Sequence, residues 1–276
     1  MFKFCLTFFQ VCGFYPIKIS KDIQVSPGLE PKASSHSRFL SFYSLLMSLF
    51  ILSAVMFVAI ENKRMIYADT MIGKFNDILI YFSLLIAHFS IIIESYFKRD
   101  YFIKFWNHFS RLIQIRNPST RSQWKRKIHL KLIIFVLYSV VSEILVITHI
   151  ESDQQWTNFW CAQIFSLLMT RHRHLQHIFF IDIIFFTLND INAHLRNTIA
   201  WTKVIPGDRK FSRVLLCKTL LETKEQFKGL MEMLICVNRI FCWSQVLNVA
   251  QHFLQVTSDL FWVYAYATGP TFLWRE

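Results

Sequence analysis

The sequence predicts an all-α integral membrane protein, a polytopic helical bundle, and three observations support this. The chain of 276 residues is 54% hydrophobic with 29 phenylalanines, and only 17% of its residues are charged. Average soluble domains carry about 25% charged residues, so this composition is typical of membrane proteins. Long apolar segments recur along the chain, and none of the six prolines falls inside them. These segments can therefore form continuous helices that satisfy their own backbone hydrogen bonds in lipid.

Residues 1–38 are predicted to be a cytosolic N-terminal segment. Their apolar beginning is too short to span a bilayer, and no small-residue cleavage site follows it. A cleaved signal peptide is therefore disfavoured. Residues 26–37 are rich in Pro and Ser and predict a loop before the first span.

Transmembrane spans 1–4 are predicted within residues 39–188. The first span, 39–60, contains no charged residue, and the second, 78–97, carries His88 at its middle and Glu94 near its end. Residues 98–131 are polar and basic, with apolar residues at helical spacing, and predict a cytosolic helical extension followed by a turn at Asn117 and Pro118.

The third and fourth spans carry charges that need partners inside the bundle. Span 3, residues 132–150, contains Glu143, and a short acidic connection over 151–159 leads to span 4 at 160–188, with Arg171 and Arg173 at its middle. An arginine at the centre of a membrane helix costs about 2.5 kcal/mol or more on insertion scales. Glu143 and Arg171 lie at similar depths from their shared outer turn, which predicts an ion pair between them.

Residues 189–239 are predicted to be a cytosolic loop and a long helix that runs directly into span 5 at 240–267, before a short outer tail at 268–276. Polar residues in span 5 recur every three or four positions and form one helical stripe: Gln245, Asn248, His252, Gln255 and Asp259. A stripe of this kind indicates a hydrogen-bonded seam between helices, a solvated pocket or conduction path, or an amphipathic surface helix.

The charge distribution predicts an N-terminus in the cytosol. Lysine and arginine concentrate before span 1, between spans 2 and 3, and between spans 4 and 5, whereas the opposite side holds only Lys63, Arg64, Lys74 and Arg275. The formal net charge of +12 is thus a topological signal that also favours anionic lipid. It gives no reason to expect a nucleic-acid partner.

The sequence gives little support for an enzyme, a metal centre or a cofactor. It contains no Ser-His-Asp elbow, no phosphate-binding Gly loop and no carboxylates paired for acid–base chemistry. His172, His174 and His177 lie close together in span 4, but no second histidine box accompanies them, so pocket lining or hydrogen bonding between spans is favoured over metal. The six cysteines follow no metal-finger spacing and predict no disulfide framework.

Four segments resemble the insect gustatory receptors, a branch of the inverted-topology insect chemoreceptor family. They are FFQVCGFYPIKIS at 8–20, IFFIDIIFFTLNDINAHLR at 178–196, LCKTLLETKEQFKGLMEMLICVNRIF at 216–241 and FWVYAYA at 261–267. The third is the most specific of the four. The resemblance extends diffusely over most of the chain.

The resemblance implies a gustatory chemoreceptor subunit of a ligand-gated cation channel in the plasma membrane of sensory neurons. It implies a small-molecule tastant, the lipid bilayer and other gustatory receptor subunits, in a homo- or hetero-tetramer, as partners. The family has seven helices, of which five spans are visible here, and the resemblance places the pore-lining helix beyond them. We therefore expect residues 1–276 to represent a C-terminally truncated subunit that conducts no ions alone.

On the same resemblance, the ligand is expected in the outer halves of spans 2 to 5. The candidate ligand contacts are Glu143, His149, Gln163, Arg171, His174, His252, Gln255 and Asp259. Two other hypotheses stay open, a multispan transporter or carrier and a nonfunctional receptor fragment. Transporters commonly contain paired, interrupted helices, which this sequence lacks, and this favours the receptor.

Overall fold

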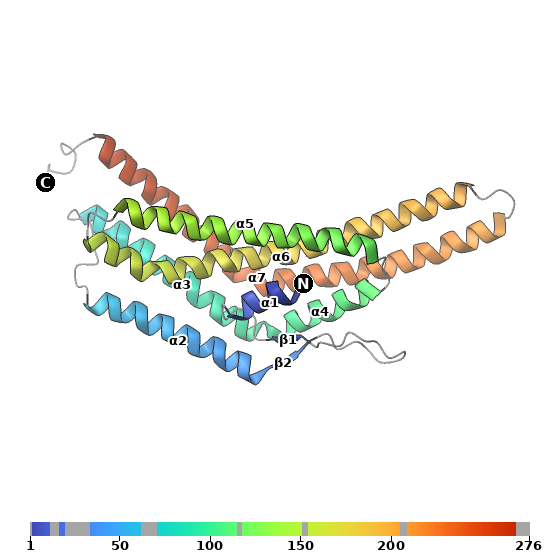
Figure 1. Ribbon diagram of the computed structural model, residues 1–276, viewed down its shortest axis with the longest axis horizontal. Helices are drawn as coiled ribbons and strands as arrows, with labels where there is room; N and C mark the ends of the chain where they lie inside the picture. The colour runs from blue at the N-terminus through green and yellow to red at the C-terminus, as the bar shows by residue number, and fades with distance from the viewer. Residues whose placement is uncertain are drawn as a thin grey trace.

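A computed structural model describes residues 2–11, 17–19, 34–61, 71–114, 118–150, 154–204 and 209–268 (Figure 1). Almost all of these residues are helical. The elements, in chain order, are α1 (Phe2–Val11), β1 (Ile17–Ile19), β2 (Ser34–His36), α2 (Arg38–Glu61), α3 (Met71–Phe97), α4 (Arg99–Gln114), α5 (Pro118–Ile150), α6 (Gln154–Val204) and α7 (Arg209–Thr268).

The fold class predicted from the sequence is confirmed. Within the described residues four helical segments are long and apolar enough to cross a membrane, namely Gly73–Phe97, Arg126–Leu145, Ser166–Thr202 and Arg213–Phe261, and Arg38–Ser53 is a shorter apolar helix. Their outward faces carry exposed large side chains such as Phe42, Tyr138 and Phe253. In a bilayer these side chains contact lipid, so their exposure needs no other partner.

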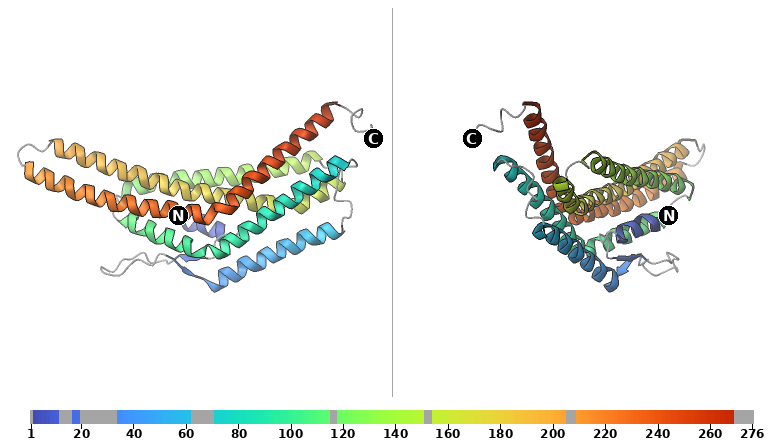
Figure 2. Two further views of the ribbon diagram at one scale, coloured as in Figure 1. Left: turned by 180° about the vertical axis from the view of Figure 1, so that it is seen from behind. Right: turned by 60° about the vertical axis from the view of Figure 1, so that its left-hand side comes forward.

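Helices α3, α6 and α7 form the centre of the bundle. Both α3 and α6 pack against α7 and against each other, α5 lies along α6, and α2 lies at the edge (Figures 1 and 2). Beyond the bundle, the end of α6 and the beginning of α7 continue side by side as a two-helix hairpin. The predicted helix that runs directly into span 5 is therefore present, as α7.

The structure differs from the sequence prediction in four local features, the first being that residues 189–204, at the start of the predicted loop, continue helix α6 as far as Val204. Residues of the N-terminal segment form a small antiparallel sheet in which Ile17 pairs with His36 and Ile19 with Ser34. The extension after span 2 is a separate helix, α4, because a turn at Lys98 interrupts the chain. Helix α6 begins at Gln154 rather than at residue 160. The predicted turn at Asn117 lies outside the described residues. Pro118 is the first residue of α5, a position where its missing N–H removes no helical hydrogen bond.

Aromatic side chains form the core that joins α4 to α6 and α7. Phe102, Phe105, Phe180 and Phe241 are almost fully buried, and the rings of Phe105 and Phe180 lie 4.6 Å apart between centroids. Phe102 and Phe180 contact in an edge-to-face arrangement, which aromatic pairs prefer. This core fixes the three helices directly beside the charged residues of span 4.

Helix α7 bends sharply near its middle in both views that show its length (Figures 1 and 2). Its sequence contains no proline, since Pro206 precedes the helix and Pro270 follows it. Sharp helix bends without proline arise at Gly/Ser pairs, at π-bulges, or where a side chain or water engages the backbone hydrogen bonds of the helix.

Candidate functional site

Arg173 is the most deeply buried charged residue in the described part of the chain. Its side chain is 0% exposed, and it forms an ion pair with Glu94 of α3, with 3.4 Å between Nη2 and Oε2. Phe241 lies against the guanidinium at 4.3 Å from the ring centroid. An unpaired charge at such a position costs several kcal/mol, so Glu94 is what makes the burial tolerable.

Both partners of this ion pair also bind the backbone of α7. Arg173 donates to the carbonyl of Ile240 at 3.0 Å, to Gln176 Oε1 at 2.7 Å and to Ser244 Oγ at 3.4 Å. Glu94 Oε1 accepts the backbone N–H of Trp243 at 2.6 Å. The pair therefore joins α3, α6 and α7 at one point. We call Arg173 and Glu94 the buried ion pair.

A second group of buried polar residues lies between the same three helices. His88 of α3 bonds Ser166 of α6 at 3.0 Å through Nδ1. On α7, Asn248 is 1% exposed and Gln251 is 2% exposed. Both amide atoms of Asn248, both of Gln251 and Nε2 of His88 have no hydrogen-bond partner. We call His88, Ser166, Asn248 and Gln251 the polar seam.

The seam residues lie at one level of the bundle. Glu94 contacts the backbone at Trp243, and Asn76 of the same helix bonds Ser258 at 2.6 Å, so α3 and α7 are antiparallel. Counting from these two contacts places His88 level with Asn248. The seam therefore lies about two helical turns from the buried ion pair, toward the end of the bundle that the charge distribution predicts to be outer.

Unpartnered polar atoms at this density are unusual inside a protein. A buried donor or acceptor without a partner costs about 1–3 kcal/mol, and native structures contain few of them. The seam contains five such atoms, on the side chains of Asn248, Gln251 and His88, and these side chains carry no net charge when His88 is neutral. These donors and acceptors are suited to hydrogen-bonding a neutral polar molecule, either ordered water or a ligand.

The predicted ion pair between Glu143 and Arg171 is confirmed. Arg171 Nη1 bonds Glu143 Oε1 and also lies 3.4 Å from Ser142 Oγ. The carboxylate is 6% exposed and the guanidinium 29%. Two of the candidate ligand contacts thus bind each other across α5 and α6.

The predicted stripe on span 5 is divided between the interior and the surface. Asn248 is buried, and Gln245 is half-buried, whereas His252 and Asp259 are exposed. Gln255 bonds Asp259 at 3.0 Å on the helix surface. The buried polar face of α7 contains Asn248 together with Ser244, Gln251 and Ser258, so it lies about one residue away from the predicted stripe.

The remaining candidate contacts are dispersed. His174 lies 3.3 Å from Gln245 through Nδ1 and Oε1, and Gln163 Nε2 is buried without a partner. The side chain of His149 lies outside the described residues. His88, Gln251 and the buried ion pair are not among the ligand contacts predicted from the sequence, although the polar residues His88 and Glu94 inside a membrane span indicate a functional position.

The histidines of span 4 do not converge. His172 Nδ1 lies 2.6 Å from the carbonyl of Leu168, whereas the ring of His177 packs on Phe241 at 4.9 Å between centroids. Over the residues with described side chains, no three His, Cys, Asp or Glu groups lie close enough to hold a metal ion.

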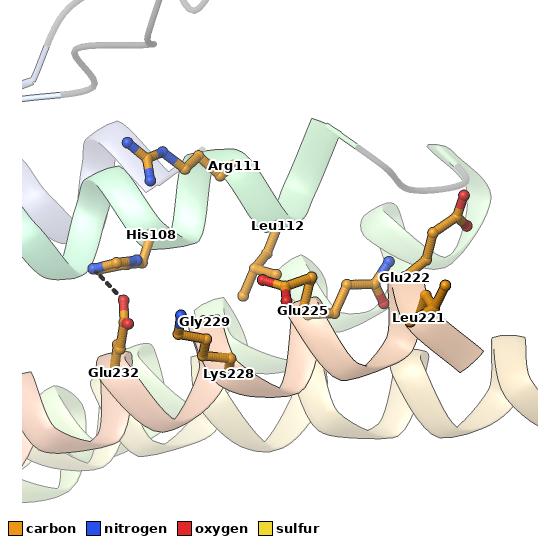
Figure 3. A pocket seen from close by; sticks show the side chains of 10 residues that line it. His108, Arg111, Leu112, Leu221, Glu222, Glu225, Lys228, Gly229 and Glu232 are labelled. Atoms are coloured by element: carbon orange, nitrogen blue, oxygen red, sulfur yellow. Dashed lines mark ion pairs between the residues drawn. The ribbon is translucent and has the colours of Figure 1, made fainter. Parts of the chain in front are cut away.

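An open groove of about 660 Å³ lies between α4 and α7, outside the membrane spans predicted from the sequence (Figure 3). Glu222, Glu225 and Glu232 line it from α7, and His108 and Arg111 from α4. His108 Nε2 lies 3.0 Å from Glu232 Oε2 across the groove. Burial lowers the pKa of His108, Arg111 and Lys104 lower it further, and Glu232 opposes them.

Stability is expected to depend on pH through His108. Because its pKa in the folded protein lies below the ordinary value of 6.5, the unfolded chain binds the proton more readily. Its favourable contribution is complete above pH 6.5 and is lost as pH falls through 6.5 toward the lowered pKa. Thermal unfolding at pH 5.5 and 7.5 should show a smaller pH difference for His108→Gln than for the wild type. An equal difference in both proteins would contradict this assignment.

The long apolar helices, the lipid-facing side chains and the charged and polar residues buried among α3, α6 and α7 define a polytopic helical membrane protein. The family model described as 7tm Chemosensory receptor matches residues 2–272. The chain therefore belongs to the 7tm chemosensory receptor family. No curated protein matches it.

Membership in this family gives the chain a chemoreceptor role in a membrane. The family is one of receptors and not of enzymes.

Proposed function

We propose that this chain is a gustatory receptor subunit of the ligand-gated cation channel type, sensing a tastant at the plasma membrane of sensory neurons. The observation that carries the ligand site is the polar seam, where Asn248, Gln251 and His88 hold unpartnered donors and acceptors between three helices. Family membership supplies the chemosensory role. Other subunits of the same family are the proposed assembly partners.

The seam favours an uncharged, hydrogen-bonding tastant. The fully buried charges of the same three helices, Arg173 and Glu94, already bind each other and the α7 backbone. A ligand with several hydroxyl or amide groups could bond the two carboxamides and His88 Nε2 without displacing a charge. Tyr81 Oη and Gln163 Nε2, also buried without partners, are proposed to extend the site toward the outer end.

The ligand must distinguish two states of the subunit to gate a channel. A molecule with equal affinity for both states shifts neither. Asn248 and Gln251 lie on α7, whereas His88 lies on α3 and Ser166 on α6, so a ligand that bonds all of them draws three helices together. Gating is then proposed to follow from the change in position of α7.

The first test is ligand binding by the purified protein in nanodiscs. Sugars, polyols, amides and alkaloids are screened for saturable thermal stabilisation, which reaches about 2.7 kcal/mol at one hundred times the dissociation constant. Uncharged polar compounds are expected to give the shift. Alkaloids alone giving it would contradict the assigned ligand class.

The second test separates the channel from the transporter. The chain is expressed in oocytes alone and with other gustatory receptor subunits, and currents are recorded as the binding compound is applied. A ligand-evoked cation current that needs this chain supports the proposal. Uptake of the labelled compound without a current would support a carrier instead.

A further inference from the structure

The bend lies near the middle of α7 (Figures 1 and 2), and Ile240 and Trp243, whose backbone groups the buried ion pair binds, also lie near the middle of Arg209–Thr268. In a straight helix the N–H of Trp243 bonds the carbonyl of Arg239, and the carbonyl of Ile240 accepts from Ser244. Here Glu94 Oε1 accepts from Trp243 N at 2.6 Å, and Arg173 Nη2 donates to Ile240 O at 3.0 Å. Side chains from α3 and α6 therefore compete for the two backbone groups that hold this turn of α7 straight.

The contacts of Arg173 leave it little freedom. Its donors have partners on Glu94, Gln176, Ile240 and Ser244, and its guanidinium lies over Phe241. Three of these five groups belong to one turn of α7. The guanidinium therefore contacts this turn of α7 as well as its counter-ion Glu94.

We propose that Arg173 and Glu94 act as a latch that holds α7 bent, and that α7 takes a straighter arrangement when the latch opens. Opening does not leave the α7 backbone unpaired, because in a straight helix Trp243 N–H bonds Arg239 O and Ile240 O accepts from Ser244 N. The latch lies between the polar seam, on the outer half of α7, and the hairpin, on its inner half. It determines how these two halves are oriented, whatever molecule the seam binds.

The test measures the distance between two positions on α7 that lie on either side of the bend. Leu221 and Leu260 are both exposed and lie on opposite sides of the bend. They are replaced by cysteine in a full chain whose native cysteines are replaced, spin-labelled, and measured in nanodiscs by pulsed electron paramagnetic resonance. A straight helix separates these positions by about 58 Å, and a 45° bend would shorten this to about 54 Å.

The informative variant removes both charges together, as E94L/R173M. Replacing a buried ion pair by apolar side chains of similar size leaves no unpaired charge, so this variant is expected to fold. Its distance should lengthen by about 4 Å toward the straight-helix value. The matched control is K131Q/D182N, because Lys131 and Asp182 pair at 2.9 Å between α5 and α6 on the exposed side of the bundle. The control distance should not change.

R173K provides a second variant. Lysine keeps the charge opposite Glu94, but its compact ammonium cannot reproduce the fork that reaches Ile240, Ser244 and Gln176 at once. Its distance distribution should broaden toward longer values. The proposal is overturned by a wild-type distance of about 58 Å, by an unchanged distance in folded E94L/R173M or R173K, or by equal lengthening in the control.

Discussion

Replacing Arg173 alone with glutamine is expected to destabilise the protein by about 3–5 kcal/mol, the cost of leaving one member of a buried ion pair unmatched. Glu94 is 4% exposed, and after the substitution it faces neither water nor a counter-ion. Because proteins are stable by only about 5–15 kcal/mol in total, this loss is a large fraction of the stability and should lower the yield of folded protein. The yield of monodisperse protein after mild solubilisation, together with unfolding by denaturing detergent, measures it.

Lys131→Gln is the control for this prediction. The Lys131 ammonium also pairs with a carboxylate, that of Asp182, but it is 58% exposed. Exposed pairs contribute about 0–1 kcal/mol, so this variant should remain close to the wild type. Equal losses of stability in the two variants would show that burial of Arg173 does not raise the cost of removing its charge.

Replacing Asn248 with leucine is expected to have opposite effects on stability and on ligand response. The two side chains are similar in size, and neither amide atom of Asn248 has a partner in the structure. Removing an unpartnered buried polar group gains about 1–3 kcal/mol for each group in the ligand-free protein. The same change removes two hydrogen-bonding atoms from the proposed ligand site. The apparent affinity for the ligand, measured from thermal stabilisation, should therefore fall at least tenfold.

The matched control for this substitution is Asn238→Leu. Asn238 lies on the same helix and is exposed. Its replacement should change neither the ligand-free stability by more than about 0.5 kcal/mol, as for most surface positions, nor the response to ligand. If Asn248→Leu lowers stability while ligand binding persists, the polar seam is a structural contact and the ligand binds elsewhere.

Sequence patterns located the helices because lipid imposes simple requirements on them. Length, apolarity and the absence of proline identified the spans, and the charge on Arg171 and Glu143 identified a pair that the structure contains. The break at Lys98 was not predictable, because no proline or glycine accompanies it and the polar sequence on both sides is compatible with helix. The pairing of β1 with β2 joins segments that are 14 residues apart in the sequence, and local periodicity does not reveal such a pairing.

The candidate site was predicted less well, for a physical reason. Helical periodicity gives the relative positions of residues around a helix but not which side faces its neighbours. The stripe that includes His252 and Asp259 is one residue away from the face that α3 and α6 cover. Similarly, two arginines two positions apart in span 4 looked equivalent in sequence, yet Arg173 is fully enclosed whereas Arg171 is partly exposed.

The hairpin that α6 and α7 form beyond the bundle converts a small tilt at its base into a larger displacement at its tip. Residues 188–204 of α6 extend about 24 Å at helical rise, and α7 continues beside them with no break between Arg209 and the membrane. A tilt of 10° at the base of such an arm moves its tip by about 4 Å. Rearrangements too small to open a path within the bundle would therefore be amplified into displacements of several ångströms at the far end of the hairpin.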